Sequence, residues 1–333
     1  MSSDLAQRRL VVSIDRFPIA GRFTIARGSR TEAVVVMASI VAGRHVGRGE
    51  CVPYSRYGET PDSVVAAIER MDAPIQEGVS RAALQHAMPP GAARNAIDCA
   101  LWDLEAKERG IAVATLAGIA NPRPLQTAYT ISLGTEQEMH AAAKVNAFRP
   151  VLKVKLGGAG DPQRVRAVRA AAPYAILIVD ANESWRAEML EENVTACVEA
   201  GVRLIEQPLP AGNDACLASF HSPVPLCADE SLHTRAELGR LKGLYAAVNV
   251  KLDKTGGLTE ALALVGQAHA EGFRVMVGCM VASSLSMAPA VIAAQGADFV
   301  DLDGPLLLAA DRESPIVYAG GTVGLPSPGL WGA

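Results

Sequence analysis

The stretch that decides the fold runs from residue 151 to residue 254 and contains VLKVKL (151–156), AILIVDAN (175–182), VRLIEQP (202–208), PLCADES (225–231) and AVNVKLDK (247–254). Each of these segments is a short apolar run that ends in a charged residue and is followed by a helix-like stretch. The steps between Lys153, Asp180, Glu206, Asp229 and Lys251 are 27, 26, 23 and 22 residues. Such steps hold one strand, one helix and their loops, so the pattern predicts a βα repeat.

The same rhythm continues on both sides of this stretch. Further strands are expected at QTAYTISL (126–133), FRVMVGCM (273–280) and FVDLD (299–303), which gives eight parallel strands with seven helical stretches between them. Eight parallel strands with short connections close most simply into a barrel. The predicted fold is therefore α/β, with a (β/α)7β modified TIM barrel over residues 124–304.

The N-terminal part of the chain lacks the βα rhythm. The segments RLVVSIDRFPI (9–19), EAVVVMASIVAG (32–43) and HVGRGECVPY (45–54) are typical of an antiparallel meander, and helices are expected at 62–74 and 92–110. These elements predict an α+β capping domain over residues 1–123, linked through NPRP (121–124) to the barrel. The Gly- and Pro-rich tail, 305–333, is expected to return to this domain.

Composition excludes several classes of protein. The chain has 31 Lys and Arg against 35 Asp and Glu, a net charge of −4, so no nucleic-acid partner is expected. No apolar run reaches membrane-spanning length, and the N-terminus has no secretory signal pattern. Six scattered cysteines without a C-x-x-C pair predict free thiols and a cytoplasmic protein. Closed homo-oligomers are common among soluble proteins, and the sequence does not fix the oligomeric state.

The charges at the strand ends are expected to meet in one site, because barrel active sites lie at the C-terminal ends of the strands. Lys153 and Lys155 are two residues apart on the second strand and so point to the same side. Lys251 follows the sixth strand, on the opposite wall. The arc between these walls is lined by the carboxylates of the third, fourth and fifth strands: Asp180, Glu206 and Asp229.

Three converging carboxylates repel one another unless a hard cation is present, and oxygen ligands with room for substrate favour Mg²⁺. A substrate carboxylate bound to the metal would present its α-carbon to a lysine on each face. One lysine, Lys155 or Lys251, would remove the α-proton, and the other would return a proton to the opposite face. Crowding by Lys153 is expected to help Lys155 act as the base.

The eighth strand adds Asp301 and Asp303, which also share one side. They are expected to lie away from the metal arc, without a compensating charge, and so to bind an ammonium group of the substrate. A small molecule with a carboxylate at the metal and an amine several bonds away fits a dipeptide better than a sugar acid.

The motifs LKVKL, VDANESW, IEQPLP, ADES, NVKLDKTGG, GCMVASS and DLDGP resemble, in order and spacing, those of the enolase superfamily, and within it the dipeptide epimerases of the muconate-lactonising subgroup. The resemblance covers nearly the whole chain. It implies Mg²⁺ at the three carboxylates, acid–base lysines at Lys155 and Lys251, and a dipeptide ammonium at Asp301 and Asp303. It also implies substrates of the L-Ala-D/L-Glu type, which are released from peptidoglycan.

The resemblance extends to the rim of the expected site. The segment FTIARGSRTEA (23–33) is similar to the capping loop of Glu-selective members, in which an arginine meets the side-chain carboxylate. Arg27 or Arg30 could fill that role. Thr130 is similar in position to a substrate-contacting threonine. Asn182 either supports the metal ligands from outside or forms the turn before the next helix.

Other functions remain open at this point. A lyase or cycloisomerase of the same superfamily, of the o-succinylbenzoate synthase or muconate type, would use the same metal and lysines but needs no ammonium site. An N-acylamino acid racemase is disfavoured for the same reason, while a dipeptide epimerase of different specificity is not. A metal-free Schiff-base aldolase and an inactive metal-binding scaffold fit the three carboxylates and two opposed lysines less well. Asp253 and Lys254, past the sixth strand, are expected to be loop structure or support for the site.

Overall fold

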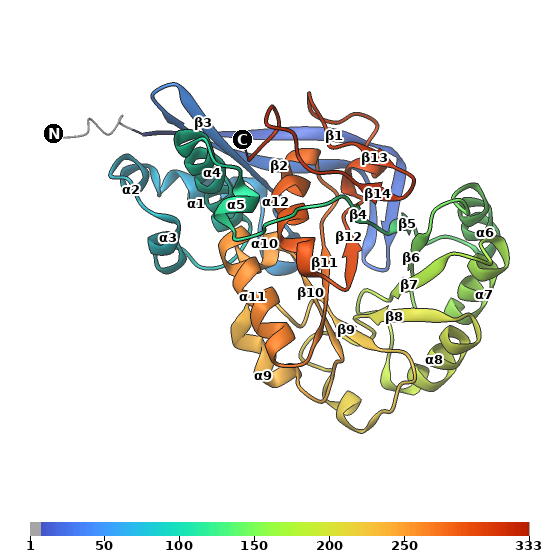
Figure 1. The fold of residues 1–333 in the computed structure, drawn as a ribbon. Coiled ribbons are helices and arrows are strands. Elements are labelled where there is room, and N and C mark those ends of the chain that lie inside the picture. Colours follow the sequence, from blue (N-terminus) through green and yellow to red (C-terminus); the bar gives the residue numbers. More distant parts are fainter. Residues whose placement is uncertain (1–7, 333) are drawn as a thin grey trace.

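Two sheets of opposite character organise the chain, as Figure 1 shows. The computed structural model describes residues 8–332. The larger sheet is parallel and follows the chain from neighbour to neighbour in the order β12-β11-β10-β9-β8-β7-β6-β5. Its strands are β5 (Tyr129–Ile131), β6 (Val151–Lys155), β7 (Ile176–Asp180), β8 (Val202–Glu206), β9 (Leu226–Ala228), β10 (Ala247–Val250), β11 (Arg274–Gly278) and β12 (Phe299–Asp301).

The ring is nearly closed between its first and last strands. The backbone N–H of Ala128 donates to the carbonyl of Val300 at 2.9 Å, and the N–H of Leu302 donates to Oγ1 of Thr127 at 2.9 Å. These two bonds form a seam between β5 and β12, whereas the other neighbouring strands of the ring are joined by regular ladders of backbone hydrogen bonds. The predicted barrel fold class is confirmed.

Helices cover the outside of the ring (Figure 1). They are α6 (Glu136–Val145), α7 (Asp161–Ala171), α8 (Leu190–Glu199), α9 (Leu238–Leu241), α11 (Leu258–Ala270) and α12 (Ser284–Ala293). The short helix α10 (Leu252–Thr255) follows β10 directly and lies against the capping domain. The connection from β8 to β9 differs from the predicted pattern, because it contains only a 3₁₀ turn, η3 (Ala215–Ser219). Pro210 and Pro223 bracket this segment together with Gly212, which leaves little room for an α-helix.

The strand predicted at 126–133 is divided in two. Only β5 belongs to the barrel, whereas β4 (Leu125–Gln126) pairs with β14 (Thr322–Val323) of the C-terminal tail, next to β13 (Tyr318–Ala319). The tail also reaches the N-terminal sheet, since Nε1 of Trp331 donates to the carbonyl of Arg48 at 2.9 Å. The domain limits 1–123 and 124–304 stay predictions.

The smaller sheet is the predicted antiparallel meander of β1 (Arg9–Ile25), β2 (Gly28–Ala42) and β3 (His45–Cys51). The helix expected at 62–74 is two helices, α1 (Pro61–Glu69) and α2 (Asp72–Gln76), and α3 (Arg81–Ala87) was not foreseen. The helix predicted at 92–110 is α4 (Ala92–Arg109), followed by α5 (Val113–Leu116). Thr60 caps α1 in a capping box in which Ser63 occupies the N3 position.

Helix α4 packs directly on the backbone of β3. A Cβ atom at Gly47 or Gly49 would collide with the carbonyl oxygens of Ala100 and Ala96, so only glycine permits this approach. The other side of α4 meets the barrel, where Nη2 of Arg94 donates to the carbonyl of Thr255 at 2.6 Å. The helix therefore joins the capping sheet to the turn that follows β10.

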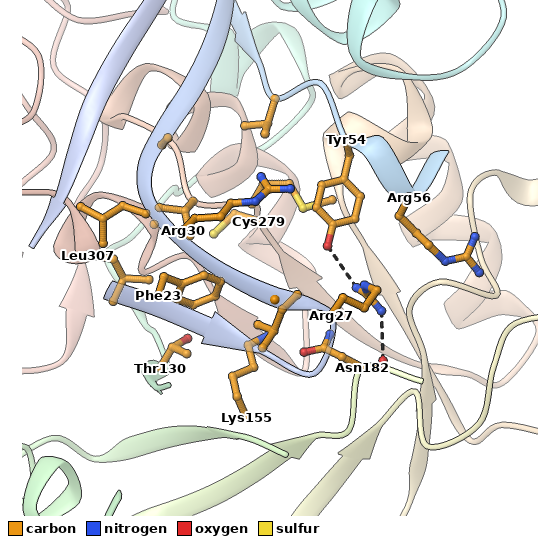
Figure 2. Close-up of a pocket in the computed structure, with 18 of the residues that line it drawn as sticks. Phe23, Arg27, Arg30, Tyr54, Arg56, Thr130, Lys155, Asn182, Cys279 and Leu307 are labelled. Carbon is orange, nitrogen blue, oxygen red and sulfur yellow. Dashed lines mark hydrogen bonds between the residues drawn. The ribbon is translucent and has the colours of Figure 1, made fainter. Parts of the chain in front are cut away.

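The β1–β2 hairpin carries its tip over the barrel. Pro18 pairs with Glu32 and Phe23 with Arg30, so residues 19–22 of β1 are opposed by a single residue of β2. Such a bulge bends the strand and changes the direction of the residues after it. The hairpin tip at residues 26–27 consequently points into the mouth of the barrel (Figure 2). Over residues 8–332, no helix combines the length and the apolar character needed to cross a membrane.

Candidate active site

Lys153 and Lys155 of β6 both point into the barrel and are 1% and 7% exposed. Nζ of Lys153 lies 2.6 Å from Oε2 of Glu206, 2.7 Å from Oδ2 of Asp301 and 3.2 Å from Oδ2 of Asp180. Nζ of Lys155 lies 2.6 Å from Oδ2 of Asp180. The structure thus brings the K-x-K pair into one buried cluster of charges.

Lys251 approaches the same cluster from the other wall, at the junction of β10 and α10. Its Nζ lies 2.7 Å from Oδ2 of Asp229 and 3.9 Å from Oε1 of Glu206. In the order of the sheet, β10 lies four positions from β6. The two predicted acid–base lysines therefore face the carboxylates from opposite sides.

The three predicted metal ligands, Asp180, Glu206 and Asp229, are buried at the ends of neighbouring strands. Burial and the neighbouring Asp180 carboxylate raise the pKa of Glu206 to about 7. Burial would also raise the pKa of Asp229, but the ammonium groups of Lys251 and Lys254 outweigh it and hold that pKa well below its usual range. Nδ2 of Asn249 orients Glu206 by donating to its Oε1 at 2.7 Å.

The surroundings of Lys153 correct one expectation from the sequence. Burial favours the neutral amine, but Asp301, Glu206 and Asp180 outweigh it and raise the pKa of Lys153 well above its usual value. The charge of Lys153 is therefore matched by three carboxylates, and the lysine is not a free positive charge that crowds Lys155.

Asp301 and Asp303 also differ from the prediction. Asp301 is not uncompensated or remote from the metal arc, because Lys153 pairs with its Oδ2 and connects it to Asp180 and Glu206. Its Oδ1 atom is buried and has no hydrogen-bond partner among residues 8–332. Asp303 accepts the backbone N–H of Thr130 at 2.6 Å. Burial and the nearby Asp301 raise the pKa of Asp303 to about 6.

The donor set fits a hard cation. In the described part of the chain, buried oxygens without a well-directed hydrogen bond include Oδ1 of Asn182, Oε2 of Glu206 and Oε2 of Glu230. Within residues 8–332, no three His, Cys, Asp or Glu side chains are arranged as a ready metal site. Nζ of Lys153 and Nζ of Lys155 instead lie against Oδ2 of Asp180. All the available atoms are oxygens, the ligands that Mg²⁺ prefers. Asn182 also steadies Asp180, whose Oδ1 accepts its backbone N–H at 2.9 Å.

A third lysine of the site was underestimated from the sequence. Nζ of Lys254 donates to Oδ1 and to the carbonyl oxygen of Asp229, at 2.5 Å each, and to the carbonyl of Asn249 at 3.0 Å. It lies three residues after Lys251, a spacing that puts both lysines on one side of a helical turn. That K-x-x-K spacing was the signal available in the sequence.

Asp253, within the same turn, connects the barrel to the capping domain. Its Oδ1 accepts the backbone N–H of Val52 at 3.0 Å and Nδ2 of Asn95 at 2.8 Å. Burial, with the carboxylates of Glu59 and Glu50, raises the pKa of Asp253 to about 7. Asp253 therefore supports the site by joining the turn after β10 to the capping domain.

A cavity of about 350 Å³ opens above these charges. The capping domain contributes one wall and the barrel the other, as Figure 2 shows. Its size suits a small molecule. Charged and polar residues that line it include Arg27, Arg30, Tyr54, Thr130, Lys155, Asp229, Lys251, Asp301 and Asp303.

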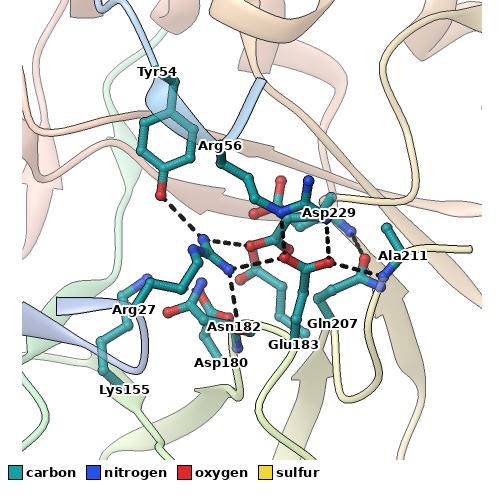
Figure 3. A network of polar contacts seen from close by, with 12 residues as sticks. Arg27, Tyr54, Arg56, Lys155, Asp180, Asn182, Glu183, Gln207, Ala211 and Asp229 are labelled. Atoms are coloured by element: carbon teal, nitrogen blue, oxygen red, sulfur yellow. Dashed lines mark hydrogen bonds and ion pairs between the residues drawn. The ribbon is translucent and has the colours of Figure 1, made fainter. Parts of the chain in front are cut away.

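The two arginines of the hairpin differ in their partners. Arg27 is paired with Oε1 of Glu230 at 2.7 Å and with Oε2 of Glu183 at 3.1 Å (Figure 3). The guanidinium of Arg30 lies 5.5 Å from the centre of the Tyr54 ring. Within residues 8–332, its side chain has no ion pair and no hydrogen bond. Arg30 is thus the hairpin cation that is open to a ligand.

Comparison with known families agrees with this geometry. Residues 134–330 match the enolase C-terminal domain-like family, and residues 7–118 match the N-terminal domain of mandelate racemase and muconate lactonizing enzyme. The chain belongs to the enolase superfamily. This membership confirms the resemblance inferred from the seven motifs, with a barrel and a capping domain typical of the superfamily.

Individual members of the superfamily are similar over nearly their whole length. The L-Ala-D/L-Glu epimerase of Escherichia coli (strain K12) is 47% identical over 320 residues, covering 96% of this chain and 100% of the relative. The N-acetyl-D-glutamate racemase of Pseudoalteromonas sp is 44% identical, covering 90% and 95% of the two chains.

Solved structures of superfamily members also superimpose closely. An enolase family member from Agrobacterium tumefaciens, with homology to dipeptide epimerases and with bound sodium and L-Ala-L-Glu, has a TM-score of 0.97 and 53% identity, covering 98% of this chain and 100% of its own. A dipeptide epimerase from Methylococcus capsulatus, complexed with Mg and L-Arg-D-Lys, has a TM-score of 0.89 and 30% identity, covering 98% and 99%.

Proposed function

We propose that this superfamily member is a Mg²⁺-dependent isomerase that inverts the α-carbon of the C-terminal residue of a dipeptide, with L-Ala-D-Glu and L-Ala-L-Glu as its substrates. The observation that carries the proposal is the placement of Lys155 and Lys251 on opposite sides of three buried carboxylates. The names of the similar L-Ala-D/L-Glu epimerase and the bound L-Ala-L-Glu of the similar structure support the choice of substrate.

Asp180, Glu206 and Asp229 would hold the metal, because they are buried oxygen donors at adjacent strand ends. When bound, Mg²⁺ supplies positive charge that offsets the negative charge developing on the substrate carboxylate as the α-proton leaves. The Mg-containing dipeptide epimerase structure supports this choice of metal. Nζ of Lys254 donates to Oδ1 of Asp229, whereas Nζ of Lys251 contacts Oδ2 of the same carboxylate.

The lysines would carry the proton. The neutral amine of one lysine accepts the α-proton, and the ammonium of the other donates a proton to the opposite face, which inverts the centre. Both amines are buried, with Lys155 7% and Lys251 6% exposed.

The remaining groups would hold the two ends of the dipeptide. Asp303 and the unpartnered Oδ1 of Asp301 offer acceptors to the free ammonium. Arg30 offers a guanidinium to the side-chain carboxylate of the glutamate, and Thr130 lines the same cavity. A bidentate arginine–carboxylate pair would make this end selective for acidic residues.

Proton NMR of L-Ala-L-Glu with the enzyme and Mg²⁺ in D₂O tests the proposal. The Glu α-proton signal should disappear while the L-Ala-D-Glu diastereomer appears, and EDTA should stop both. Absence of exchange with L-Ala-L-Glu and with a set of L-Ala-L-X dipeptides would overturn the proposal in favour of lyase or cycloisomerase chemistry.

N-acetylglutamate racemisation is a second candidate, because Lys153 already compensates Asp301 and a similar protein is named N-acetyl-D-glutamate racemase. The two candidates share the metal, the lysines and Arg30 but differ at the amine. Values of kcat/KM for L-Ala-L-Glu and for N-acetyl-L-Glu, measured on one preparation, separate them. A clear preference for the acetylated compound would replace the first candidate.

We also propose a cytoplasmic location, which the six free cysteines support. Assembly into a homo-oligomer stays a prediction, and size-exclusion chromatography with light scattering would test it.

A further inference from the structure

The tip of the β1–β2 hairpin connects the capping domain to the barrel through several loops. The backbone N–H of Leu133, after β5, donates to the carbonyl of Thr24 at 3.0 Å. At the tip itself, Arg27 reaches the loops that follow β7 and β9 (Figure 3). Because the bulge at residues 19–22 bends β1, this short tip is directed into the barrel mouth.

Both terminal nitrogens of the Arg27 guanidinium, Nη1 and Nη2, donate two hydrogen bonds each. Nη1 donates to the carbonyl of Asn182 at 3.0 Å and to Oε2 of Glu183 at 3.1 Å. Nη2 donates to Oε1 of Glu230 at 2.7 Å and to the hydroxyl of Tyr54 at 3.0 Å. The side chain is only 27% exposed, so these charge-assisted bonds are partly shielded from water.

The barrel partners of Arg27 lie beside the proposed metal ligands in the chain. Asn182 and Glu183 follow Asp180 by two and three residues, and Glu230 directly follows Asp229. Asn182 and Glu183 adopt positive φ angles of 44° and 69°, which are unfavourable for residues other than glycine. Such a backbone persists only when its surroundings hold it, so contacts to this loop help to hold the chain directly after Asp180.

A second arginine of the capping domain reinforces the same point. Nε and Nη2 of Arg56 donate to the two carboxylate oxygens of Glu183, at 2.9 Å each. The backbone N–H of Ala211 donates to Oε1 of Glu183 at 2.8 Å. Glu183 is therefore the point at which two capping arginines and a barrel loop meet, and among residues 8–332 Arg27 alone joins it to Glu230.

We propose that Arg27 is a latch: it fastens the capping hairpin to the β7 and β9 loops and thereby positions the proposed metal ligands Asp180 and Asp229 for every substrate. Recognition of the acidic side chain is left to Arg30, on the other strand of the same hairpin. Arg27 is a positioning residue in this assignment and does not contact the substrate carboxylate. The expected effect on kcat/KM rests on the proposed function. The attachment of the hairpin to the barrel loops rests on the structure alone.

The test compares Arg27→Met with Arg30→Met on two isosteric dipeptides, L-Ala-L-Glu and L-Ala-L-Gln. Arg27→Met should lower kcat/KM by a similar factor on both substrates, of about 10- to 100-fold, as outer contacts of metal ligands typically do. Arg30→Met should lower it on L-Ala-L-Glu only. Arg27→Lys keeps the positive charge but cannot donate all four hydrogen bonds of the guanidinium, so its loss of kcat/KM should be intermediate. Arg22→Met, on the exposed part of the hairpin, is the matched control and should resemble the wild type.

Limited trypsin digestion supplies a readout that needs no activity. Release of the latch should speed cleavage after Arg30 in Arg27→Met relative to Arg22→Met, as followed by mass spectrometry. A loss confined to L-Ala-L-Glu in Arg27→Met would make Arg27 a substrate contact and overturn the latch. Unchanged cleavage would overturn it as well. An inactive wild type would refute the proposed function and still leave the digestion as a test of the latch.

Discussion

Lys153 and Asp301 form a buried ion pair, with Nζ of the lysine 2.7 Å from Oδ2 of the aspartate. The pair occupies one oxygen of the carboxylate that was predicted to meet the substrate amine. Asp303 is bonded by Thr130 and has no ion pair within residues 8–332, so it is the principal carboxylate left for an ammonium.

The first prediction concerns pH. Burial and Asp301 raise the pKa of Asp303 to about 6, so protonation below that pH removes the charge that attracts the ammonium. For L-Ala-L-Glu, kcat/KM should fall as the pH drops through about 6, approaching a tenfold loss per unit. N-acetyl-L-Glu has no ammonium, and its profile should lack this limb. Identical limbs for both compounds would assign the titration to another group.

The second prediction concerns the two opposed lysines. Lys155→Ala and Lys251→Ala should each lower net epimerisation by about 10²- to 10⁴-fold, the usual contribution of an acid or base. Each single variant should still exchange the α-proton of one epimer with D₂O, since the remaining lysine faces one side of the substrate. Lys144→Ala, on the exposed surface of α6, is the control. Full turnover in both site variants would contradict the two-base mechanism.

The third prediction concerns Arg30. Its replacement by Met removes a cation of the cavity that has no ion pair and no hydrogen bond within residues 8–332, although it lies 5.5 Å from the centre of the Tyr54 ring. A hydrogen bond to a charged group contributes about 1.5–3 kcal/mol, so kcat/KM for L-Ala-L-Glu should fall by roughly one to two orders of magnitude. The value for L-Ala-L-Gln should change little. Parallel losses on both dipeptides would show that Arg30 also has a general role.

The fourth prediction concerns stability. The pKa of Asp253 is raised to about 7, so the folded protein holds a proton that the unfolded chain releases between pH 4 and 7. The contribution of Asp253 to the free energy of unfolding therefore falls as the pH rises through that range, by an amount on the order of a few kcal/mol. Asp253→Asn keeps an oxygen for Val52 and Asn95 and removes the buried charge.

Urea unfolding at several pH values measures this effect. The variant and the wild type should be similarly stable near pH 4, and the variant should be the more stable protein near pH 8. Subtracting the two curves removes the titrations that they share. A difference that does not change with pH would show that Asp253 keeps an ordinary pKa in the folded state.

The barrel and its central charges could be predicted from sequence because each depends on local spacing. Local spacing assigns a charge to its strand and to one end of that strand, so Lys155, Asp180 and Lys251 were placed at the ends of the correct strands. The helix expected between β8 and β9 failed for a local reason too, the Pro and Gly residues around η3.

The remaining errors depend on contacts between distant parts of the chain. The pairing of Lys153 with Asp301 follows from how the ring closes, 148 residues apart in sequence. The separate surroundings of Arg27 and Arg30 follow from the bend at residues 19–22, which sets where the hairpin tip lands. The periodicity of the strands in the sequence predicts neither the pairing of Lys153 with Asp301 nor the position of the hairpin tip.

The contact between Thr130 and Asp303 crosses the seam between the first and last strands of the ring. The carboxylate of Asp303 thus adds a bond to the seam and, in the proposed enzyme, binds the amine of the substrate. If the protein evolved toward substrates without an amine, loss of Asp303 would still lower thermal stability. Without Asp303, the seam would keep its bonds from Ala128 to Val300 and from Leu302 to Thr127 but would lose the bond from Thr130. Loss of amine selectivity and retention of this aspartate are therefore expected to coexist in descendants of such a chain.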